Sequence, residues 1–394
     1  MSFRVAVVAA AILLLPHPGS AQTELRGYAL GVGSYVGESA LVNGGSTLFR
    51  RARPMLTWDG SWLSSEVAYE HLLQRHPAGG GFGITSAGTP RGGTAWLPLD
   101  GTIHRSGRSS WRHQLDRMAL RASRGPLEVT LGRQAISWAT TLFLTPADPF
   151  SPFDPADPFR EYRGGVDAAR VRYFTGSFTE LEAVVRPIDA GSETPITALA
   201  RISTSRGGWA FGLWGGLLHE EPAGAAFVTG GLGATSLRTE FALREDPDGG
   251  ALVRGSLGLD RFFQPGGRDL RAMVEVQYDG FGAASAEEIV LVSQSAAYRR
   301  GELQVIGAWT AAAQASWQLH PLVAIDALAL TSLVDGSALL APGLSWSTTA
   351  SVSTRLGAFF GVGADAAAIG PVAVPGSEYG SVPPLVYLSL SFFF

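Results

Sequence analysis

The sequence predicts an all-β fold: a transmembrane, antiparallel, up-and-down β-barrel of about eighteen strands, with about 16 or 14 as alternatives. The first observation is the alternation in the last ten residues, where Val386, Leu388 and Leu390 share one strand face and Ser389 lies on the other. The second is that similar segments recur along the chain, and the third is that short and long connections alternate between them. A membrane barrel needs such alternation because lipid surrounds it and water fills it. A secreted β-sandwich is the alternative fold.

The N-terminal segment has the pattern of a secretory signal peptide. Arg4 precedes an apolar run that is too short to span a bilayer, and small residues follow it up to Ala21. We therefore predict a cleavable signal peptide over residues 1–21 and a single barrel domain over residues 22–394. Export and a barrel fold together predict the bacterial outer membrane as the location. The C-terminal Phe394 resembles the signal by which outer-membrane insertion machinery recognises such proteins.

The composition fits an exported barrel. The chain has no cysteine, so its stability must come from a closed hydrogen-bond network instead of disulfides. Its 50 glycines suit strands and tight turns, and its 10 tryptophans, 9 tyrosines and 20 phenylalanines can supply aromatic girdles at the membrane surfaces. A net charge of −4 gives no reason to expect nucleic acid as a partner, and no motif requires a cofactor.

Segments with period-2 alternation are separated by Gly, Pro, Asp and Ser residues. Each is long enough for a tilted strand to cross the hydrocarbon core of a bilayer. We predict strands at residues 24–35, 47–58, 61–73, 112–123, 126–136, 165–175, 178–188, 194–205, 208–219, 225–245, 249–262, 269–279, 289–299, 302–319, 322–333, 336–347, 350–362 and 385–394. The segment 225–245 is one long or interrupted strand in this scheme.

The connections alternate in length, as in an outer-membrane barrel. Every second connection is mostly short, for example Asp59-Gly60 and His320-Pro321. The longest gaps, 74–111, 137–164 and 363–384, all fall at the opposite end. We therefore expect short periplasmic turns and long extracellular loops.

Charged residues of the predicted strands are expected to face the lumen. An arginine on the lipid face at mid-membrane would cost about 2–4 kcal/mol, which favours inward placement. The residues concerned are Arg117, Arg121, Arg170, Arg172, Arg186, Arg201, Arg238, Arg254, Arg355, Glu128, Glu180, Glu182, Glu240, Asp260 and Asp326. The predicted lumen is thus polar and mixed in sign.

Residues 138–164 differ from the rest of the chain. Closely spaced prolines and three Asp-Pro steps exclude both a helix and a strand within a sheet, and Phe143, Phe150, Phe153 and Phe159 are apolar anchors. We predict a stiff loop that packs against the inner wall and narrows the pore. The charged residues of this predicted constriction are Arg133, Asp148, Asp154, Asp157, Arg160, Glu161, Arg163, Arg170 and Arg172.

Two other interpretations of this loop remain open. It can be an external loop whose charges pair only with one another, or its three aspartates can form a calcium site. The Asp-Pro spacing lacks the glycine-hinged ligand loop of an EF-hand, and we predict no metal site.

The same region carries a resemblance to a known family. The motifs concerned are Gly132-Arg133-Gln134, Ile136-Ser137-Trp138, the Asp-Pro run, Glu161-Tyr162-Arg163, Gly165-Val166-Asp167-Ala168, His320-Pro321-Leu322 and Asp335-Gly336-Ser337. Together they resemble a porin-like outer-membrane family, which is distantly similar to alginate-export and substrate-specific channel barrels. The resemblance implies a monomeric or loosely associated channel of about 14–18 strands and names no solute. Ala139 stands where the family pattern has a glycine.

We therefore predict a channel, not an enzyme, for passive diffusion of small polar or charged solutes, with outer-membrane lipid as its surroundings. The alternative is a non-conducting structural, adhesive or envelope-assembly barrel that is plugged by its own loops. The least favoured hypothesis is a barrel hydrolase that uses His104 or His113 with Asp116. The sequence leaves the oligomeric state open.

Overall fold

The computed structural model describes residues 22–39, 41, 43–76, 95–150, 159, 162–189, 194–245, 249–369 and 372–394. The predicted signal peptide therefore lies outside the described residues. In the part of the chain that is described, no helix is long and apolar enough to cross a membrane.

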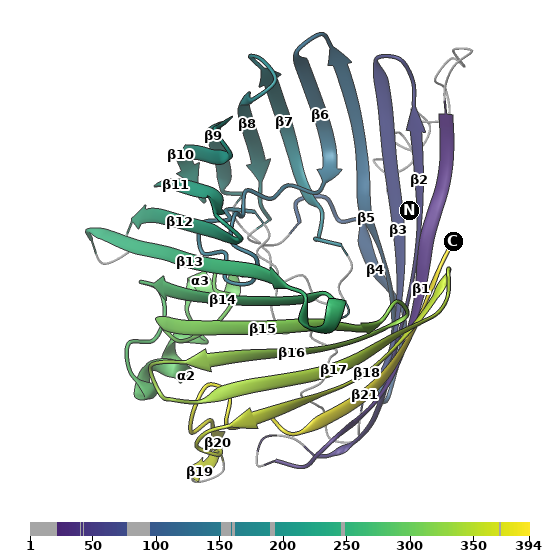
Figure 1. Ribbon diagram of the computed structural model, residues 1–394, viewed down its shortest axis with the longest axis vertical. Coiled ribbons are helices and arrows are strands. Elements are labelled where there is room, and N and C mark those ends of the chain that lie inside the picture. Colours follow the sequence, from purple (N-terminus) through teal and green to yellow (C-terminus); the bar gives the residue numbers. More distant parts are fainter. Residues whose placement is uncertain are drawn as a thin grey trace.

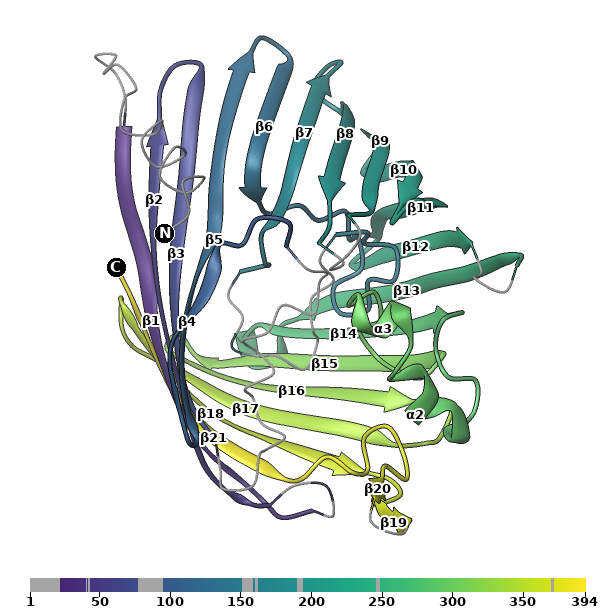
Figure 2. The same ribbon diagram turned by 180° about the vertical axis from the view of Figure 1, so that it is seen from behind.

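Eighteen antiparallel strands close into a barrel (Figures 1 and 2). Each strand pairs with its neighbour along the chain, and the last strand, β21 (Leu385–Phe393), pairs with both β18 (Val352–Val362) and β1 (Gln22–Val36). The ring thus has no open edge, which satisfies the backbone hydrogen bonds of every wall strand. The predicted all-β, up-and-down barrel is confirmed.

The other wall strands follow in chain order. They are β2 (Gly45–Asp59), β3 (Leu63–Arg75), β5 (Ser109–Arg124), β6 (Leu127–Gln134), β7 (Val166–Phe174), β8 (Thr179–Pro187), β9 (Ile196–Arg206), β10 (Trp209–Leu218), β11 (Glu221–Leu232), β12 (Thr235–Glu245), β13 (Ala251–Phe263), β14 (Leu270–Asp279), β15 (Trp309–His320), β16 (Val323–Ser332) and β17 (Ala338–Thr349). Outside the ring lie β4 (Asp100–Ser106), paired with β5, and the hairpin β19 (Ala367–Ile369) and β20 (Val372–Val374). The helices are short: η2 (Pro265–Gly267), η3 (Ala286–Glu288), α2 (Ile289–Val292) and α3 (Ala296–Arg299).

The strand number is as predicted, but two individual strands are not. The segment 225–245 contains parts of two strands, β11 and β12, because Gly233 adopts a positive φ of 64° and makes a tight turn. The segment 289–299 forms the helices α2 and α3 instead of a strand. The apolar residues of this segment suit a strand. In the structure Ser295 instead caps α3 by accepting a hydrogen bond from the amide of Tyr298 (3.1 Å). The two errors offset each other in the count.

The two ends of the barrel differ in the length of their connections. One end carries short turns, such as 125–126, 207–208 and 321–322, and 264–269 is the longest of them. The other end carries the connections 76–108, 135–165, 280–308 and 363–384. We call these ends the short-turn rim and the long-loop rim.

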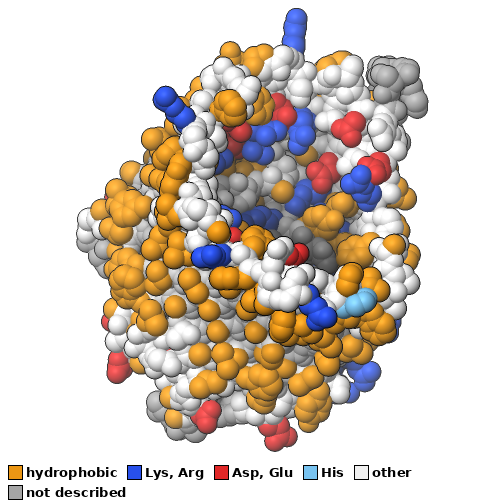
Figure 3. Space-filling model, viewed as in Figure 1, with side chains coloured by type: hydrophobic (Ala, Val, Ile, Leu, Met, Phe, Trp, Pro, Cys, Tyr) orange, Lys and Arg blue, Asp and Glu red, His pale blue; other side chains and the backbone are white. Residues whose placement is uncertain are grey.

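The outer surface of the barrel is apolar (Figure 3). In β21, Leu388 and Leu390 are 56% and 54% exposed, whereas Tyr387 and Ser389 are buried on the inner side. Exposed aromatic side chains gather near both rims. They include Trp62, Phe178, Phe262, Trp346 and Phe394 at the short-turn rim and Tyr35, Trp111, Trp309 and Phe360 at the long-loop rim. Aromatic girdles on both sides of an apolar band are typical of a membrane-embedded barrel.

The inner surface carries cross-strand ion pairs. Arg172 of β7 lies directly opposite both Glu128 of β6 and Glu182 of β8, and it pairs with Glu128. Glu182 in turn pairs with Arg170 (2.6 Å) and with Arg201 of β9 (3.7 Å). Each of these charged side chains has a partner of opposite charge on a neighbouring strand. This pairing explains how the charges are accommodated inside the ring.

Leu388→Arg tests which side of β21 faces lipid. The substitution should destabilise the barrel by about 2–4 kcal/mol, because it places a guanidinium on the apolar belt. Unfolding by urea in lipid vesicles measures this loss. Ser353→Arg, on the inner side opposite Ser391, is the matched control and should cost much less. An equal loss in both variants would contradict the outward placement of Leu388.

Candidate functional site

The candidate site is the inner loop, which we define as residues 138–164. It leaves β6, enters the ring of strands and returns to β7, and both views place its described part inside the barrel (Figures 1 and 2). Its prolines remove backbone donors and prevent a regular ladder. Its remaining amides need acceptors from elsewhere, because buried backbone donors are rarely left without a partner.

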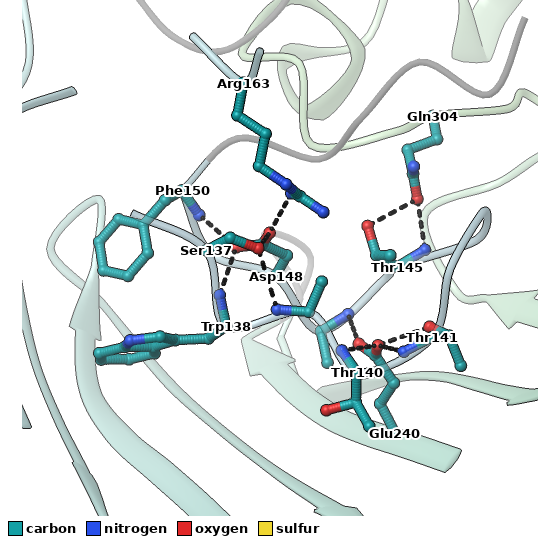
Figure 4. Close-up of polar contacts among 12 residues, drawn as sticks. Ser137, Trp138, Thr140, Thr141, Thr145, Asp148, Phe150, Arg163, Glu240 and Gln304 are labelled. Atoms are coloured by element: carbon teal, nitrogen blue, oxygen red, sulfur yellow. Dashed lines mark hydrogen bonds and ion pairs between the residues drawn. The ribbon is translucent and has the colours of Figure 1, made fainter. Parts of the chain in front are cut away.

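Glu240 of β12 supplies the first group of acceptor oxygens (Figure 4). Its carboxylate accepts hydrogen bonds from the amides of Thr140 (2.8 Å), Thr141 (2.7 Å) and Ala147 (3.2 Å) and from the Thr141 hydroxyl. The side chain was predicted to face the lumen and does so, but its function there is to hold the loop. One wall carboxylate thereby fixes both ends of a short stretch of the inner loop.

Glu275 of β14 continues the same arrangement. Its carboxylate accepts from the amides of Leu142 (2.6 Å), Phe143 (2.8 Å) and Leu144 (2.9 Å). Five consecutive amides, 140–144, are therefore bound by two buried wall carboxylates. Bonds to a charged acceptor are about twice as strong as those between neutral groups, so this stretch is held firmly against β12 and β14.

Asp148 closes the loop on itself (Figure 4). Its side chain has 0% exposure in its ion pair with Arg163 (2.8 Å). It also accepts from the Ser137 hydroxyl (2.8 Å) and from the amides of Trp138 (3.3 Å) and Phe150 (3.2 Å). The two ends of the inner loop, far apart along the chain, are thus joined at a single carboxylate.

Apolar contacts hold the same part of the loop to the wall. The rings of Trp138 and Phe150 meet edge to face at 4.8 Å, and Trp138 also lies against Trp214 of β10. Phe150 is 2% exposed, in agreement with its predicted function as an anchor. Phe159 is buried too, against Tyr387 of β21, whereas Phe153 lies outside the described residues.

Arginines hold the far end of the inner loop against the opposite wall. Arg51 of β2 donates to the Phe159 carbonyl (2.8 Å), and the guanidinium of Arg53 lies 4.3 Å from the centre of the Tyr162 ring. Arg117 of β5 donates to the Arg163 carbonyl. The inner loop is therefore attached to both sides of the barrel, through its amides on β12 and β14 and through its carbonyls and a ring on β2 and β5.

The structure separates the predicted constriction residues into distinct groups. Asp148 and Arg163 are in contact, as expected, but Asp148 is buried and fully engaged within the loop. Arg133 is buried in a bidentate pair with Asp167 of β7 (2.8 Å). The residues that keep partial exposure are Arg163, Arg170 and Arg172, whose side chains are 23%, 17% and 21% exposed. Asp154, Asp157, Arg160 and Glu161 lie outside the described residues.

A small charged cavity of about 20 Å³ lies between the inner loop and β10–β13. Glu302, from the connection between β14 and β15, pairs there with Arg244 and Arg300. Burial opposes ionisation of Glu302, but the charges of Arg244, Arg300, His219 and Arg254 outweigh it and lower its pKa to about 2. The group is therefore a carboxylate at neutral pH.

His219 completes this cluster from the tight turn between β10 and β11. Its φ of 56° and that of Glu220, 69°, are both positive, as a two-residue hairpin turn requires. The ring Nε2 lies 3.6 Å from Glu302. Burial lowers the pKa of His219 to about 4, and Arg300, Arg186 and Arg244 add to the decrease, although Glu302 opposes it.

The long loops are also tied to one another. Gln304 accepts from the amide of Thr145 (2.6 Å) and donates to the Phe143 carbonyl (2.8 Å). Two residues further along, the carboxyl of Glu378 accepts from the amides of Ile306 (2.7 Å) and Gly307 (3.0 Å). A continuous set of hydrogen bonds therefore joins the inner loop to the connections 280–308 and 363–384.

Several of these residues escaped the sequence analysis. Gln304 and Glu378 lie in segments read as a strand or a featureless gap, so nothing suggested a function for them. Glu275 lies in the predicted strand 269–279, but no local signal showed that loop amides would meet it. The one signal in the sequence for such a loop-binding residue is a carboxylate on the inward face near the middle of a strand.

The structure also bears on the hydrolase and metal-site hypotheses. The ring Nδ1 of His113 lies 2.9 Å from the Tyr69 hydroxyl, whereas the Asp116 carboxylate binds Arg53 and Arg117, so these two hydrolase candidates have other partners. Among the described residues, no group of three or more His, Asp or Glu side chains could hold a metal ion.

Comparison with known proteins gives likeness in fold alone. No protein-family model and no curated protein matches the chain. Among solved structures, OccAB1 of Acinetobacter baumannii is similar with a TM-score of 0.54 and 10% identity, covering 94% of this chain and 96% of its own. A BenF-like porin from Pseudomonas fluorescens Pf-5 has a TM-score of 0.54 and 11% identity, with 95% and 98% covered. OpdK of Pseudomonas aeruginosa, solved with vanillate, has a TM-score of 0.54 and 10% identity, with 94% and 98% covered.

Glu275→Gln tests the attachment of the inner loop. An amide side chain has one acceptor oxygen, so at least one of the three loop amides loses its partner, at a cost of about 1–3 kcal/mol. Amides 142–144 should exchange with solvent about tenfold to hundredfold faster in hydrogen-exchange mass spectrometry. Glu180→Gln, which changes a wall carboxylate that pairs with Arg172, should leave these amides unchanged.

Acidification should loosen the connection 280–308 in two steps. The pKa of His219 is lowered from 6.5 to about 4, so its neutral form contributes stability that falls between those pH values. The pKa of Glu302 is lowered from 4.5 to about 2, so its ion pairs lose their contribution only over that lower range. Protection of the Glu302 amide, which donates to the Ala297 carbonyl, reports both steps. His219→Gln should abolish the upper step alone; an unchanged profile would refute the assignment.

Proposed function

We propose that the protein is an outer-membrane channel through which small polar or charged solutes diffuse passively. The observation that carries this proposal is a closed ring with an apolar exterior and a hollow interior lined by charged side chains (Figure 3). Water must reach such an interior, because ion pairs that retain exposure are poorly accommodated in a sealed apolar core. Transport is therefore favoured over catalysis.

The inner loop is proposed to form the constriction. It is attached to both sides of the ring, by Glu240 and Glu275 on one side and by Arg51 and Arg53 on the other. Because the inner loop is attached on both sides, it keeps its position and narrows the lumen without closing it. Arg163 of the loop and Arg170 and Arg172 of the β7 wall remain partly exposed and are proposed to act on passing solutes, together with the predicted Asp154, Asp157, Arg160 and Glu161.

Charge in the lumen suggests a first solute to test. Each of the partly exposed arginines is paired, so a solute with its own carboxylate would compete with a wall carboxylate for a guanidinium. OpdK was solved with vanillate, an aromatic carboxylate, and its fold is similar to that of this chain. Vanillate is therefore a suitable candidate for this channel, with an uncharged sugar of similar size as the comparison.

The proposal also includes the route to the membrane. Residues 1–21 would direct export, residues 22–394 would form the single barrel domain, and Phe394 at the end of β21 would be recognised by the insertion machinery. The exposed belt of Leu388, Leu390 and Phe392 would then face outer-membrane lipid.

A second candidate function is a structural barrel that does not conduct. The observation that favours it is the hydrogen-bonded connection of the inner loop to the connections 280–308 and 363–384, which fills part of the lumen. A liposome-swelling assay distinguishes the two functions, because only a channel admits sugars or vanillate.

The channel is tested by conductance in planar bilayers. The purified protein should give discrete current steps, and the double variant Glu240→Gln/Glu275→Gln should give larger or noisier steps, because the inner loop loses acceptors on one side. Glu24→Gln, which changes an exposed carboxylate at the short-turn rim, is the control and should conduct like the wild type. Absence of conductance under all conditions, together with no swelling, would refute the channel.

A further inference from the structure

The outer wall carries a basic patch beside the long-loop rim. We define the outer basic patch as Arg50, His71, Arg75, His104 and Arg108, with Trp111 among them. It is built by β2, β3, β4 and β5, where β4 continues the sheet along the edge of β5. None of these residues lines the lumen, and the strand register fixes the face on which they lie.

Cross-strand pairing places the patch on the outer face. Arg50 lies opposite Leu73, and Leu73 lies opposite Trp111, so these three side chains form one row. Leu73 and Trp111 are 37% and 41% exposed, whereas the alternating neighbours Leu72 and Gln74 are buried on the inner side. Residues directly opposite each other share a face, so Arg50 points outward with them.

The adjoining rows extend the patch. Arg75 lies opposite both Leu48 and Ser109 in the row nearer the rim. His71 lies on the other side of the Arg50 row, where its Nδ1 accepts a hydrogen bond from Trp111 (3.2 Å). His104 of β4 lies opposite Trp111 and is exposed. The basic groups therefore occupy three consecutive rows of one outer surface.

These arginines differ from several of those in the lumen in their lack of an acidic partner. Within the described residues, Arg50, Arg75 and Arg108 form no ion pair, whereas Arg170 and Arg172 each pair with a wall glutamate. An open cleft of about 410 Å³ at the rim exposes two of them. Its lining consists of Gly44, Gly45, Ser46, Thr47, Leu48, Arg75 and Arg108. Two guanidinium groups and the hydroxyl of Ser46 are donors of the kind that a phosphate group accepts.

The depth of the patch excludes the hydrocarbon region as its surroundings. An arginine that faces lipid is strongly unfavourable at mid-membrane, and this penalty becomes small near the interface. Trp111 and Tyr35 mark the long-loop girdle at this level. Away from the rim, Leu56 and Leu120 continue the same outer wall as an apolar surface.

We propose that the outer basic patch binds the phosphate group of an anionic lipid in the leaflet that faces the long loops. The headgroup phosphate lies in the rim cleft against Arg75 and Arg108 and near Arg50, and the acyl chains lie along Leu56 and Leu120. Charge complementarity selects the phosphate, and the apolar wall beneath it selects a lipid over a soluble anion. The inference rests on the membrane location proposed above.

Native mass spectrometry of the full mature chain in detergent tests the proposal, with bis-phosphorylated lipid A as the probe and phosphatidylcholine as the neutral comparison. Wild-type protein should retain lipid A and not phosphatidylcholine. The double variant Arg50→Gln/Arg75→Gln should bind lipid A at least about tenfold more weakly, since two charged contacts to the phosphate are lost. The conservative variant Arg50→Lys/Arg75→Lys should retain most of the binding, because it keeps both charges.

The control is Arg206→Gln, which removes an exposed arginine at the short-turn rim and should leave lipid A binding unchanged. Equal weakening in this variant, unchanged binding in the double variant, or displacement of lipid A by equimolar inorganic phosphate would overturn the proposal. Conductance of the double variant should equal that of the wild type. A wild type that binds lipid A without conducting would refute the channel and leave the lipid site standing, so the two failures are distinguishable.

Discussion

Pairing of the last strand with the first is the interaction on which the rest of the structure depends. Phe394 and Gly27 exchange two backbone hydrogen bonds (2.9 and 3.0 Å), and the register continues from Tyr28 opposite Phe393 to Val36 opposite Leu385. Without this pairing two strand edges would be open, and unsatisfied backbone groups in hydrocarbon cost several kcal/mol each. Gly27 permits the contact, since a Cβ there would lie 2.5 Å from the Phe394 ring.

Once the barrel is closed, the backbone groups that still need hydrogen-bond partners are those of the inner loop. The strands satisfy their own backbone, but the inner loop cannot, because its prolines prevent a regular ladder. Glu240 and Glu275 solve this by presenting carboxylates to consecutive loop amides. The same wall therefore has two functions: it excludes lipid on the outside and supplies acceptors on the inside. Glu240 and Glu275, which fix the loop, are distinct from Arg170 and Arg172 of β7, whose side chains keep partial exposure.

Sequence reasoning obtained the barrel and its eighteen strands, although two of its strand assignments were wrong. Strand alternation is a local property, so the inward and outward faces of β21 could be read directly from the sequence. The segment 289–299 could not, because an apolar run of this length fits a strand or a helix equally well and tertiary surroundings decide. The segment 225–245 is divided by a turn at Gly233, and the neighbouring glycines hid the position of this turn in the sequence.

The sequence by itself determined that the chain has an apolar outer face, a polar lumen and a proline-rich segment that cannot join the wall. Each of these features follows from residue type and spacing. Only the tertiary structure decided which charges meet. The fold buries Arg133 against Asp167, and it buries Asp148 separately inside the inner loop. It also brings Glu240, Glu275 and Gln304 to loop amides that are far away in the chain. It also gathered Arg50, Arg75 and Arg108 on one outer surface. Such meetings depend on barrel closure and register, which are properties of the whole ring and of no single segment.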